Sequence, residues 1–387
     1  MTFLLYNRTW GKRVTNSLSQ IFFLNLALGL ILGFVFHRSD LCMAGMFRDI
    51  FLLKRTFLLR ILYLQVIVTM ALFFIAKKAG LISLYPPPNL NIASLGTLAG
   101  GMIFGIGMVL AGGCVIGTLY KMGSGSIISI IAFAGLIIGS AVFAEFYPFW
   151  AEFSKRTRVS EAVLLPQLIN EHLLTLPILF ISSMLIFRWM RSKKLHQKAY
   201  AEGYIHPWKV VIIIALLNLI IYISSDMPMA VSTGYAKIAA YLEKILVPDH
   251  FETVAFFKKE SYSVLHPVSK ALIAGGPGAM FDHIFSTEIS LIIGIIFGSF
   301  ISAILLGEFK LTLSTLPPLR QNISALLGGI LLALGSRMAG GCNVKFLMSG
   351  LPLLSIQAFL FLFGMLPGAW LGTYLFKKFV ISYDREG

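Results

Sequence analysis

Long apolar runs separated by short polar stretches dominate the pattern of this chain. A helix needs about 20 mostly apolar residues to cross a bilayer, and about nine runs approach or reach that length. The pattern therefore predicts an all-α polytopic membrane protein with about nine transmembrane helices. The predicted spans are 19–36, 57–76, 92–111, 126–144, 172–190, 209–225, 288–306, 322–339 and 353–376.

Four segments between these runs are too short to cross, yet are half apolar and rich in small residues. Each follows a polar or glycine-rich break in the chain. Lipid does not tolerate exposed backbone at such breaks, so these segments must be packed inside the protein or line a wet cavity. We interpret them as short re-entrant helices, with helices lying in the membrane interface as the alternative. The segments are 40–52, 113–122, 229–245 and 341–350.

The chain also repeats itself. Ala111-Gly112-Gly113-Cys114 returns 228 positions later as Ala339-Gly340-Gly341-Cys342, and the match extends upstream through Leu98, Gly100, Gly101 and Gly107 at the same offset. An odd number of steps between equivalent spans reverses their direction, which predicts an inverted repeat with its site near the membrane midplane. The predicted halves are 1–144 and 205–387, joined by a connecting helix and loops in 145–204.

Composition and charge limit the function. The chain has 387 residues, 57% of them hydrophobic and 13% charged, with a net charge of +15. Such an apolar composition excludes a soluble fold. Lys and Arg are scattered among apolar runs and form no continuous basic stripe, which argues against nucleic acid as a partner. Anionic membrane lipid and an anionic solute explain the positive charge better.

The three cysteines are the strongest candidates for chemistry. They contain no CxxC, so they predict neither a disulfide framework nor a metal site. Cys42, Cys114 and Cys342 each open a short segment, and Gly113 and Gly341 allow the backbone to approach closely there. A helix start favours an anion, and a thiol offers a weak S–H donor to a soft sulfur atom. Buried cysteine as a small hydrophobic residue is the alternative.

Charged and amide side chains inside the spans supply further candidates. Arg337 lies two positions before Ala339 in an apolar run, where it either attracts an anion or forms a structural pair. Lys121 and Lys345 follow their cysteines and either line a vestibule or mark an interface. Three amides and one carboxylate are expected to form hydrogen bonds between helices. These residues are Asn25, Asn218, Gln357 and Glu145.

Three linked motifs resemble the YeeE/YedE-type sulfur-transport family of bacterial membrane proteins, which includes thiosulfate permeases. They are Arg38-Ser39-x-x-Cys42-x5-Arg48-Asp49, Leu110-Ala111-Gly112-Gly113-Cys114-x2-Gly117, and Gly335-x-Arg337-x2-Gly340-Gly341-Cys342-Asn343. A weaker fourth match is Ala230-Val231-Ser232-Thr233-Gly234, where Ser232 or Thr233 replaces a cysteine. The 226–287 loop is longer than the family pattern leads us to expect.

The resemblance implies a multi-pass protein of the bacterial cytoplasmic (inner) membrane with an inverted-repeat fold. It implies that the three cysteines pass thiosulfate along by S–H···S contacts, and that a small cytosolic sulfur-carrier protein is a partner. Arg38 belongs to the first motif and joins the candidate substrate-binding residues. A branch of the family linked to selenium leaves the substrate open between sulfur and selenium species.

We therefore predict a permease for thiosulfate or a similar sulfur oxyanion, without enzymatic activity and without a cofactor. A membrane thiol enzyme and a selenium-related transporter are the alternatives. The chain has no GxxxxGK[ST] motif, so no nucleotide motor is built in. Few carboxylates lie within the spans, which argues against a dedicated proton relay. We expect downhill permeation, driven by consumption of the solute inside the cell.

Overall fold

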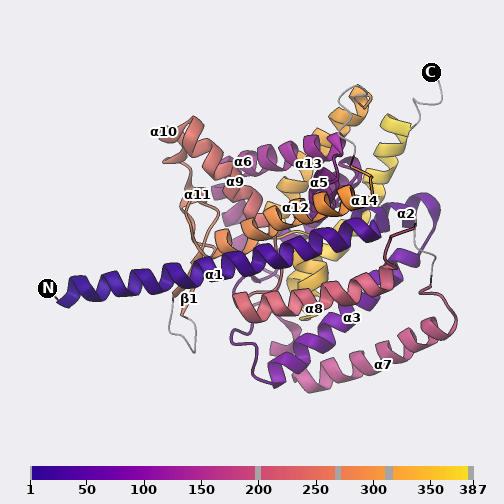
Figure 1. Ribbon diagram of the computed structural model, residues 1–387, viewed down its shortest axis with the longest axis horizontal. Coiled ribbons are helices and arrows are strands. Elements are labelled where there is room, and N and C mark those ends of the chain that lie inside the picture. The colour runs from indigo at the N-terminus through magenta and orange to yellow at the C-terminus, as the bar shows by residue number, and fades with distance from the viewer. Residues whose placement is uncertain (1, 197–201, 266–271, 310–316, 382–387) are drawn as a thin grey trace.

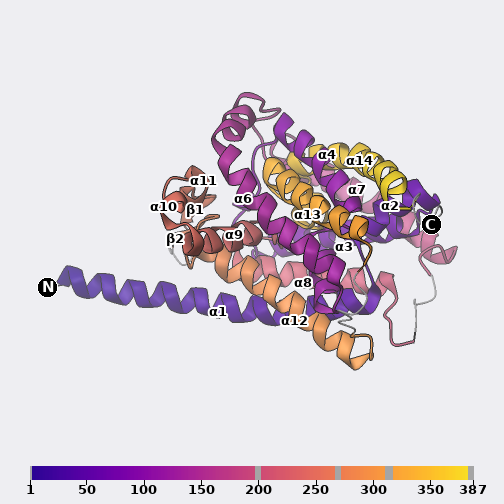
Figure 2. The ribbon, with the colours of Figure 1, turned by 90° about the horizontal axis from the view of Figure 1, so that it is seen from above.

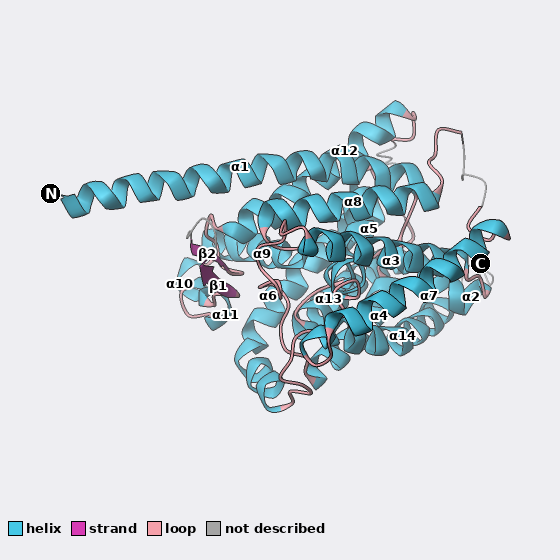
Figure 3. Cartoon of the chain, turned by 90° about the horizontal axis from the view of Figure 1, so that it is seen from below, coloured by secondary structure: helices cyan, strands magenta, loops and turns pink. Residues whose placement is uncertain are grey.

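The computed structural model describes residues 2–196, 202–265, 272–309 and 317–381 and shows an almost entirely helical protein (Figures 1 and 3). Within these residues nine helical stretches are long and apolar enough to cross a membrane, which confirms the predicted all-α polytopic class. Their long helices are α1 (Thr2–Ser39), α3 (Phe57–Lys78), α4 (Leu95–Leu110), α6 (Ile127–Arg156), α7 (Glu171–Arg191), α8 (Pro207–Ser225), α12 (Ser290–Leu305), α13 (Leu319–Ala339) and α14 (Ile356–Phe376).

Two of these helices are much longer than the apolar runs that predict them. α1 begins at residue 2 rather than 19, and α6 continues to Arg156 rather than ending near 144. In both cases the extension is polar or aromatic in sequence, so hydropathy does not detect it. A helix ends where its backbone is interrupted, and such breaks are absent from both extensions apart from Pro148, which α6 accommodates.

Short helices occupy all four of the predicted short segments. They are α2 (Met43–Leu53), α5 (Val115–Gly123), α9 (Ser232–Leu246) and the wide π-helical turn η3 (Val344–Gly350). All seven residues of η3 and most of α5 are buried within the protein. α5 and η3 therefore contribute to the protein interior, whereas α2 and α9 are only partly buried.

A residue with left-handed backbone geometry precedes each short helix. Asp40, Gly112, Asp226 and Gly340 have φ values of 46°, 68°, 55° and 79°. Glycine adopts this conformation without strain, and a short polar side chain such as that of aspartate tolerates it better than most others. Each such residue stops a long helix, and the three cysteines all stand two positions after one of them.

Helices α4 and α13, which carry the repeated glycines, cross in close backbone contact (Figure 2). The Gly100 backbone lies against Gly335 and Ala339, whereas that of Gly107 lies against Gly328. The two helices therefore run antiparallel. Because Gly100 and Gly107 correspond to Gly328 and Gly335 in the repeat, each contact exchanges into the other, as expected of a two-fold interface.

The neighbouring helices follow the same reciprocity. Gly364 and Gly368 of α14 face the carbonyls of Leu98 and Met102 in α4. Reciprocally, Gly135 and Gly139 of α6 face those of Leu326 and Ile330 in α13. The GxxxG formed by Gly101 and Gly105 meets α14 as a helix-packing motif. Small residues thus let the four central helices approach at backbone distance.

Buried amides join helices as the sequence predicted. Asn25 of α1 donates to Ser225 Oγ of α8 at 2.9 Å. Asn218 of α8 donates to the Met348 carbonyl, also at 2.9 Å, and Gln357 of α14 donates to the Ala339 carbonyl at the end of α13. These bonds tie the long helices to the breaks that precede η3 and the other short segments.

The 226–287 loop holds structure that the apolar pattern did not predict. Strands β1 (Tyr262–Leu265) and β2 (Leu272–Gly275) form an antiparallel hairpin, with Tyr262 opposite Gly275. Helices α10 (Pro248–Phe251) and α11 (Ala255–Lys258) precede the hairpin, and the wide turn η2 (Phe285–Ile289) leads from it into α12. The remaining short elements are η1 (Leu165–Gln167) and η4 (Lys377–Ile381).

The glycine contacts predict a stability effect. A Cβ at Gly368 would lie 2.1 Å from the Met102 carbonyl oxygen, so Gly368→Ala must push α4 and α14 apart. Overpacking of this kind costs about 1–3 kcal/mol. We expect a clear fall in the thermal unfolding midpoint of the purified protein. Gly139→Ala, at the equivalent position in α6, should cost a similar amount.

Gly45→Ala is the matched control, because the nearest atom to a Cβ there is 4.0 Å away. Alanine also favours the helix over glycine, so this variant should be at least as stable as the wild type. A Gly368→Ala protein that unfolds at the wild-type temperature would show that the backbones are not in close contact.

Candidate functional site

Each cysteine lies at the start of a short helix, as the sequence predicted. Cys42 is the N-cap of α2 and Cys114 the N-cap of α5, while Cys342 directly precedes the helical turn that continues into η3. Sγ of Cys114 accepts the N–H of Gly117 at 3.3 Å, so a sulfur atom fills the role of a capping oxygen. All three thiols are free and buried.

Cys42 and Cys114 lie next to each other. Their thiols interact directly, and both sulfurs lie beside Gly117. A Cβ at that glycine would come 2.8 Å from Sγ of Cys42 and 3.4 Å from Sγ of Cys114. Gly117, which belongs to the second sequence motif, therefore leaves the space that the pair of thiols occupies.

Asn343 connects the second half to this pair. Its side chain is fully buried, contacts Cys114, and donates from Nδ2 to Sδ of Met43 at 2.9 Å. Its Oδ1 is buried without a hydrogen-bond partner among the described residues. The residue after Cys342 thus reaches the two thiols of the first half with an unused acceptor. Asn343 ends the third sequence motif, and the sequence alone indicates no role for it.

Tyr235 of α9 lies between the first-half thiols and Cys342. The ring is buried, and its hydroxyl donates to the carbonyl of Val115 at 3.2 Å. It lies within electrostatic range of both Cys114 and Cys342. All four short helices therefore contribute to one central region. The apolar pattern did not identify Tyr235, because an aromatic residue in a short helix reads as ordinary core.

A cavity of about 480 Å³ opens beside Cys342. We call it the vestibule. Its walls come from the starts of α4 and α14, the ends of α6 and α13, and the loop around the β-hairpin. Arg337, Lys345 and Glu288 line it, and the first and last of these lie within electrostatic range of Cys342. Gln357, Thr97 and Asn91 add polar groups to the wall.

The charged groups of the vestibule are unequally satisfied. Nζ of Lys345 donates to the Gly340 carbonyl at 2.5 Å, and Oε2 of Glu288 accepts the N–H of Gly234 at 2.8 Å. The Nε of Arg337 is buried and has no hydrogen-bond partner within the described parts of the chain. An anion in the vestibule would meet two cations, one of them with an unused donor.

The sequence indicates Arg337 and Lys345 as candidates with two readings each, and both residues line the vestibule. It gives little indication of Glu288, which stands at the polar edge of an apolar run. The only signal was its position inside the predicted 288–306 span, where carboxylates are costly.

Arg38 does not reach the vestibule. Its guanidinium donates to Ser302 Oγ at 3.2 Å and to the Gly203 carbonyl at 2.8 Å. Ser302 and Glu288 are 14 residues apart along α12 and the turn before it, which is roughly 20 Å of helix. The structure thus places Arg38 at the opposite end of the protein, where it links α1, α12 and the loop before α8.

The thiols of the first half have charged neighbours of their own. Nζ of Lys121 donates to the Gly112 carbonyl at 3.0 Å, and the Tyr120 hydroxyl donates to Asp40 at 3.0 Å. Lys121 also lies within electrostatic range of Cys42. Lys121 and Lys345 therefore make the same contact, each binding the carbonyl of the left-handed glycine before its cysteine.

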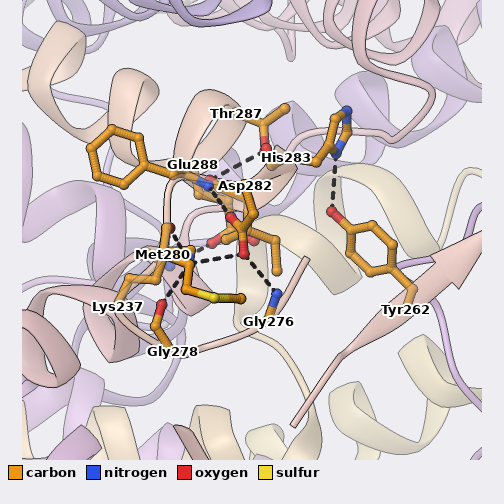
Figure 4. A network of polar contacts seen from close by, with 12 residues as sticks. Lys237, Tyr262, Gly276, Gly278, Met280, Asp282, His283, Thr287 and Glu288 are labelled. Carbon is orange, nitrogen blue, oxygen red and sulfur yellow. Dashed lines mark hydrogen bonds and ion pairs between the residues drawn. The ribbon is translucent and has the colours of Figure 1, made fainter. Parts of the chain in front are cut away.

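Figure 4 shows a polar network that fixes the loop wall of the vestibule. Lys237 of α9 is fully buried, pairs with Asp282 at 2.9 Å, and donates to the carbonyls of Gly278 and Met280. Nδ1 of His283 is 3.0 Å from the Tyr262 hydroxyl. Burial lowers the pKa of His283 to about 4, so its ring is neutral at physiological pH. The wall is held by one buried ion pair and neutral hydrogen bonds.

Three potential metal ligands meet elsewhere on the surface. Glu145, Glu243 and His250 bring ligand atoms within 4.8 Å of one another. Nδ1 of His250 is 2.7 Å from Glu243, and this hydrogen bond raises the pKa of the histidine. The contacts are those of an exposed acidic–histidine cluster, and none of the three residues lines the vestibule.

Comparison with known proteins gives a consistent result. Residues 38–371 match the family model described as "Sulphur transport". A protein from Spirochaeta thermophila named "Thiosulfate transporter TsuA" is 26% identical over 361 residues, covering 91% of this chain and 98% of the relative. The Escherichia coli protein of the same name is 26% identical over 363 residues, covering 90% and 93%. The "Probable transporter YedE" of Escherichia coli matches a shorter stretch, 28% identical over 131 residues.

The positions of the thiols predict different access from the two faces. Cys342 lies beside the vestibule, whereas Cys114 follows the opposite end of the antiparallel helix. In single-cysteine variants, a small charged methanethiosulfonate added on the vestibule side should react with Cys342 much faster than with Cys114. Labelling at equal rates from one face would contradict this arrangement. The rates can be followed by mass spectrometry of intact protein.

Proposed function

The chain belongs to the sulphur-transport family, and we propose that it carries thiosulfate, or a similar sulfur oxyanion, across the cytoplasmic membrane of a bacterium. The observation that carries the proposal is a cation-lined vestibule whose wall includes Gly340 and Lys345 on either side of the buried Cys342, together with the buried pair of thiols of Cys42 and Cys114. The names of the two long relatives support thiosulfate as the solute. The arrangement favours a transporter over an enzyme that transfers sulfur.

Charge selects the solute at the vestibule. Arg337 and Lys345 face the cavity without a direct ion pair to a carboxylate in the described part of the chain. Two fixed cations suit a dianion, and a guanidinium with an unused N–H binds an oxyanion oxygen well. The polar wall residues Gln357 and Asn91 add neutral hydrogen-bonding capacity. Thiosulfate thus exchanges its hydration for charge and hydrogen bonds on entry.

Thiols then replace water along the path. The terminal sulfur of thiosulfate is large and polarisable, and an S–H group is a weak donor that holds such an acceptor loosely. Loose contacts favour passage, because tight binding at any one position would slow release. From Cys342 the anion moves past Tyr235 and Asn343 to the Cys42–Cys114 pair without forming a covalent bond. A thiol holds the sulfur end of the anion at each step.

Two inverted halves make this path continuous. We propose that α2, α5, α9 and η3 are re-entrant helices and that the halves 1–144 and 205–387 are inverted repeats joined by 145–204. The exchangeable contacts between α4 and α13 support this relation, as do the left-handed residues before all four short helices. Each half brings a broken helix to the centre from its own side, so that the breaks meet in the interior.

The expected cytosolic partner fits the energetics of the path. A dianion entering a negative interior works against about 2.3 kcal/mol per charge per 100 mV. A small sulfur-carrier protein that consumes thiosulfate at the inner face would keep its internal concentration low and draw the anion inward. We include that partner in the proposal on the strength of the family resemblance. Anionic lipid around the positively charged loops completes the expected surroundings.

Replacing the thiols should abolish transport without unfolding the protein. We expect Cys42→Ala, Cys114→Ala and Cys342→Ala each to reduce uptake of labelled thiosulfate into liposomes at least tenfold, since each removes one transfer site. Serine should rescue poorly, because a hydroxyl is a smaller and harder partner for sulfur than a thiol. The unfolding midpoint should change little, and a folded, fully active triple variant would exclude the thiol path.

The same liposomes separate the alternatives. A thiol enzyme would convert thiosulfate to sulfite and bound sulfur, which chromatography of the internal solute detects. Unchanged thiosulfate inside the vesicles supports transport. Competition by selenium oxyanions at lower concentration than by thiosulfate would favour the selenium-related alternative.

Arg337→Gln should weaken loading of the anion. A hydrogen bond to a charged group contributes about 1.5–3 kcal/mol, so the half-saturating thiosulfate concentration should rise about tenfold or more. Arg156→Gln is the matched control, since Arg156 is 77% exposed and pairs only locally with Glu152. Unchanged saturation in Arg337→Gln would show that the anion does not contact this residue.

A further inference from the structure

Glu288 is a buried carboxylate for which the transport path has no role. It lies in the turn that leads into α12, is 7% exposed, and lines the vestibule with Arg337 and Lys345. A carboxylate in such a place has lost most of its hydration, which is unfavourable unless positive charge compensates for it. The groups that compensate this charge therefore indicate what the residue does.

The start of α9 compensates part of it. Oε2 of Glu288 accepts the N–H of Gly234, the third residue of α9, at 2.8 Å. Helix N-termini offer unpaired N–H groups and about half a unit of positive charge, and they commonly bind anions. The corresponding helix of the first half, α2, has Cys42 at its N-cap instead. In the second half a carboxylate from the chain itself fills the anion position.

Arg337 and Lys345 compensate the rest from a longer distance. Both attract the Glu288 carboxylate, yet neither forms a direct ion pair with it among the residues that the structure describes. Nε of Arg337 remains without a partner. The two cations are therefore balanced by Glu288 through space and still free to bind a ligand directly.

We propose that Glu288 is a tethered anion, which balances Arg337 and Lys345 while the vestibule is empty and binds a proton when a dianion enters. A dianion by itself balances the two cations. The carboxylate then becomes an uncompensated negative charge beside the ligand, and a proton from vestibule water removes that charge. The inference rests on the proposed function, because it takes thiosulfate as the dianion.

Apart from Lys345, the other titratable groups around Glu288 have settled charge states. Lys237 of α9 is paired with Asp282, and His283 is neutral because burial lowers its pKa to about 4. Burial also keeps Tyr262 of β1 protonated, since it raises the pKa of that phenol. Tyr235 also faces the carboxylate, from α9, and Lys259 near the mouth is exposed to solvent. Burial lowers the pKa of Lys345 to about 8, so this lysine can also bind a proton when the anion enters near pH 8. Below about pH 7 Lys345 already carries its proton, and Glu288 is the group whose charge responds to the ligand.

Linked binding gives a sharp test. Thiosulfate remains a dianion between pH 6 and pH 8, so any pH dependence of its binding in this interval belongs to the protein. Because a proton binds with the anion, the Kd for labelled thiosulfate on the purified full-length protein should fall as the pH falls. The limit is about tenfold per pH unit for one linked proton. Equilibrium dialysis at several pH values measures it.

Glu288→Gln separates charge from geometry. The amide oxygen of glutamine can still accept the Gly234 N–H, but the side chain carries no charge. We expect this variant to bind thiosulfate as tightly as the wild type does at low pH, and with the same Kd from pH 6 to pH 7, where Lys345 is already protonated. Glu252→Gln is the control, because Glu252 is 68% exposed and lies outside the vestibule. It should keep the wild-type slope.

Proton uptake provides a second readout. Thiosulfate added to wild-type protein in weak buffer should raise the pH of the solution, by up to one proton bound per anion, and Glu288→Gln should abolish this change. A wild-type Kd that does not vary with pH overturns the proposal, as does a variant that keeps the slope. If the variant cannot be purified, the wild-type proton count between pH 6 and pH 7 decides, because Lys345 already carries its proton there. Failure of the wild type to bind thiosulfate at any pH would overturn the proposed function itself.

Discussion

The structure depends on how it satisfies the backbone where its helices break inside an apolar environment. A free N–H or C=O there costs several kcal/mol, because lipid offers no replacement for water. At each of the four breaks, one side chain forms a hydrogen bond with the exposed backbone. Ser39 accepts the N–H of Leu41 and Asn218 that of Met229, while Lys121 and Lys345 bind the carbonyls of Gly112 and Gly340. The broken helices are stable in the protein interior because these side chains satisfy the backbone groups that each break leaves without a helical partner.

The same devices explain why the two halves differ at the centre. Lysines satisfy the breaks before Cys114 and Cys342, so each brings a positive charge close to a thiol. At the starts of α2 and α9 the halves diverge, since one presents Cys42 and the other binds Glu288 through Gly234. A symmetric backbone thus carries an asymmetric set of side chains. On the proposed path, a solute that enters at the vestibule would meet charge first and paired thiols later.

Much of the fold could be predicted from the sequence, because hydropathy indicates the length of each span and repeated glycines indicate where two backbones approach closely. The nine spans, the four short helices and the interhelical roles of Asn25, Asn218 and Gln357 needed no structure. The polar extensions of α1 and α6 were not predicted, because helices do not have to be apolar outside the membrane. Glu288, Tyr235 and Asn343 were not predicted either, because their importance depends on contacts with residues far away in the sequence. The β-hairpin was not predicted, because its short strands show no distinctive hydrophobic period. The assignment of Arg38 to the substrate site remains a prediction, although the hydrogen-bond partners of Arg38 lie away from the vestibule.

The glycine contacts between α4, α13, α6 and α14 also bear on how the protein works. Backbones in contact along four helices leave no slack, since a small rotation would drive one carbonyl into the next helix. These four helices therefore form a rigid core. Large rocking of one half against the other would require separating surfaces that fit at backbone distance. If the protein transports its solute as proposed, the movements of turnover would be confined to side chains and to the starts of the short helices, as in a narrow channel with several weak binding sites.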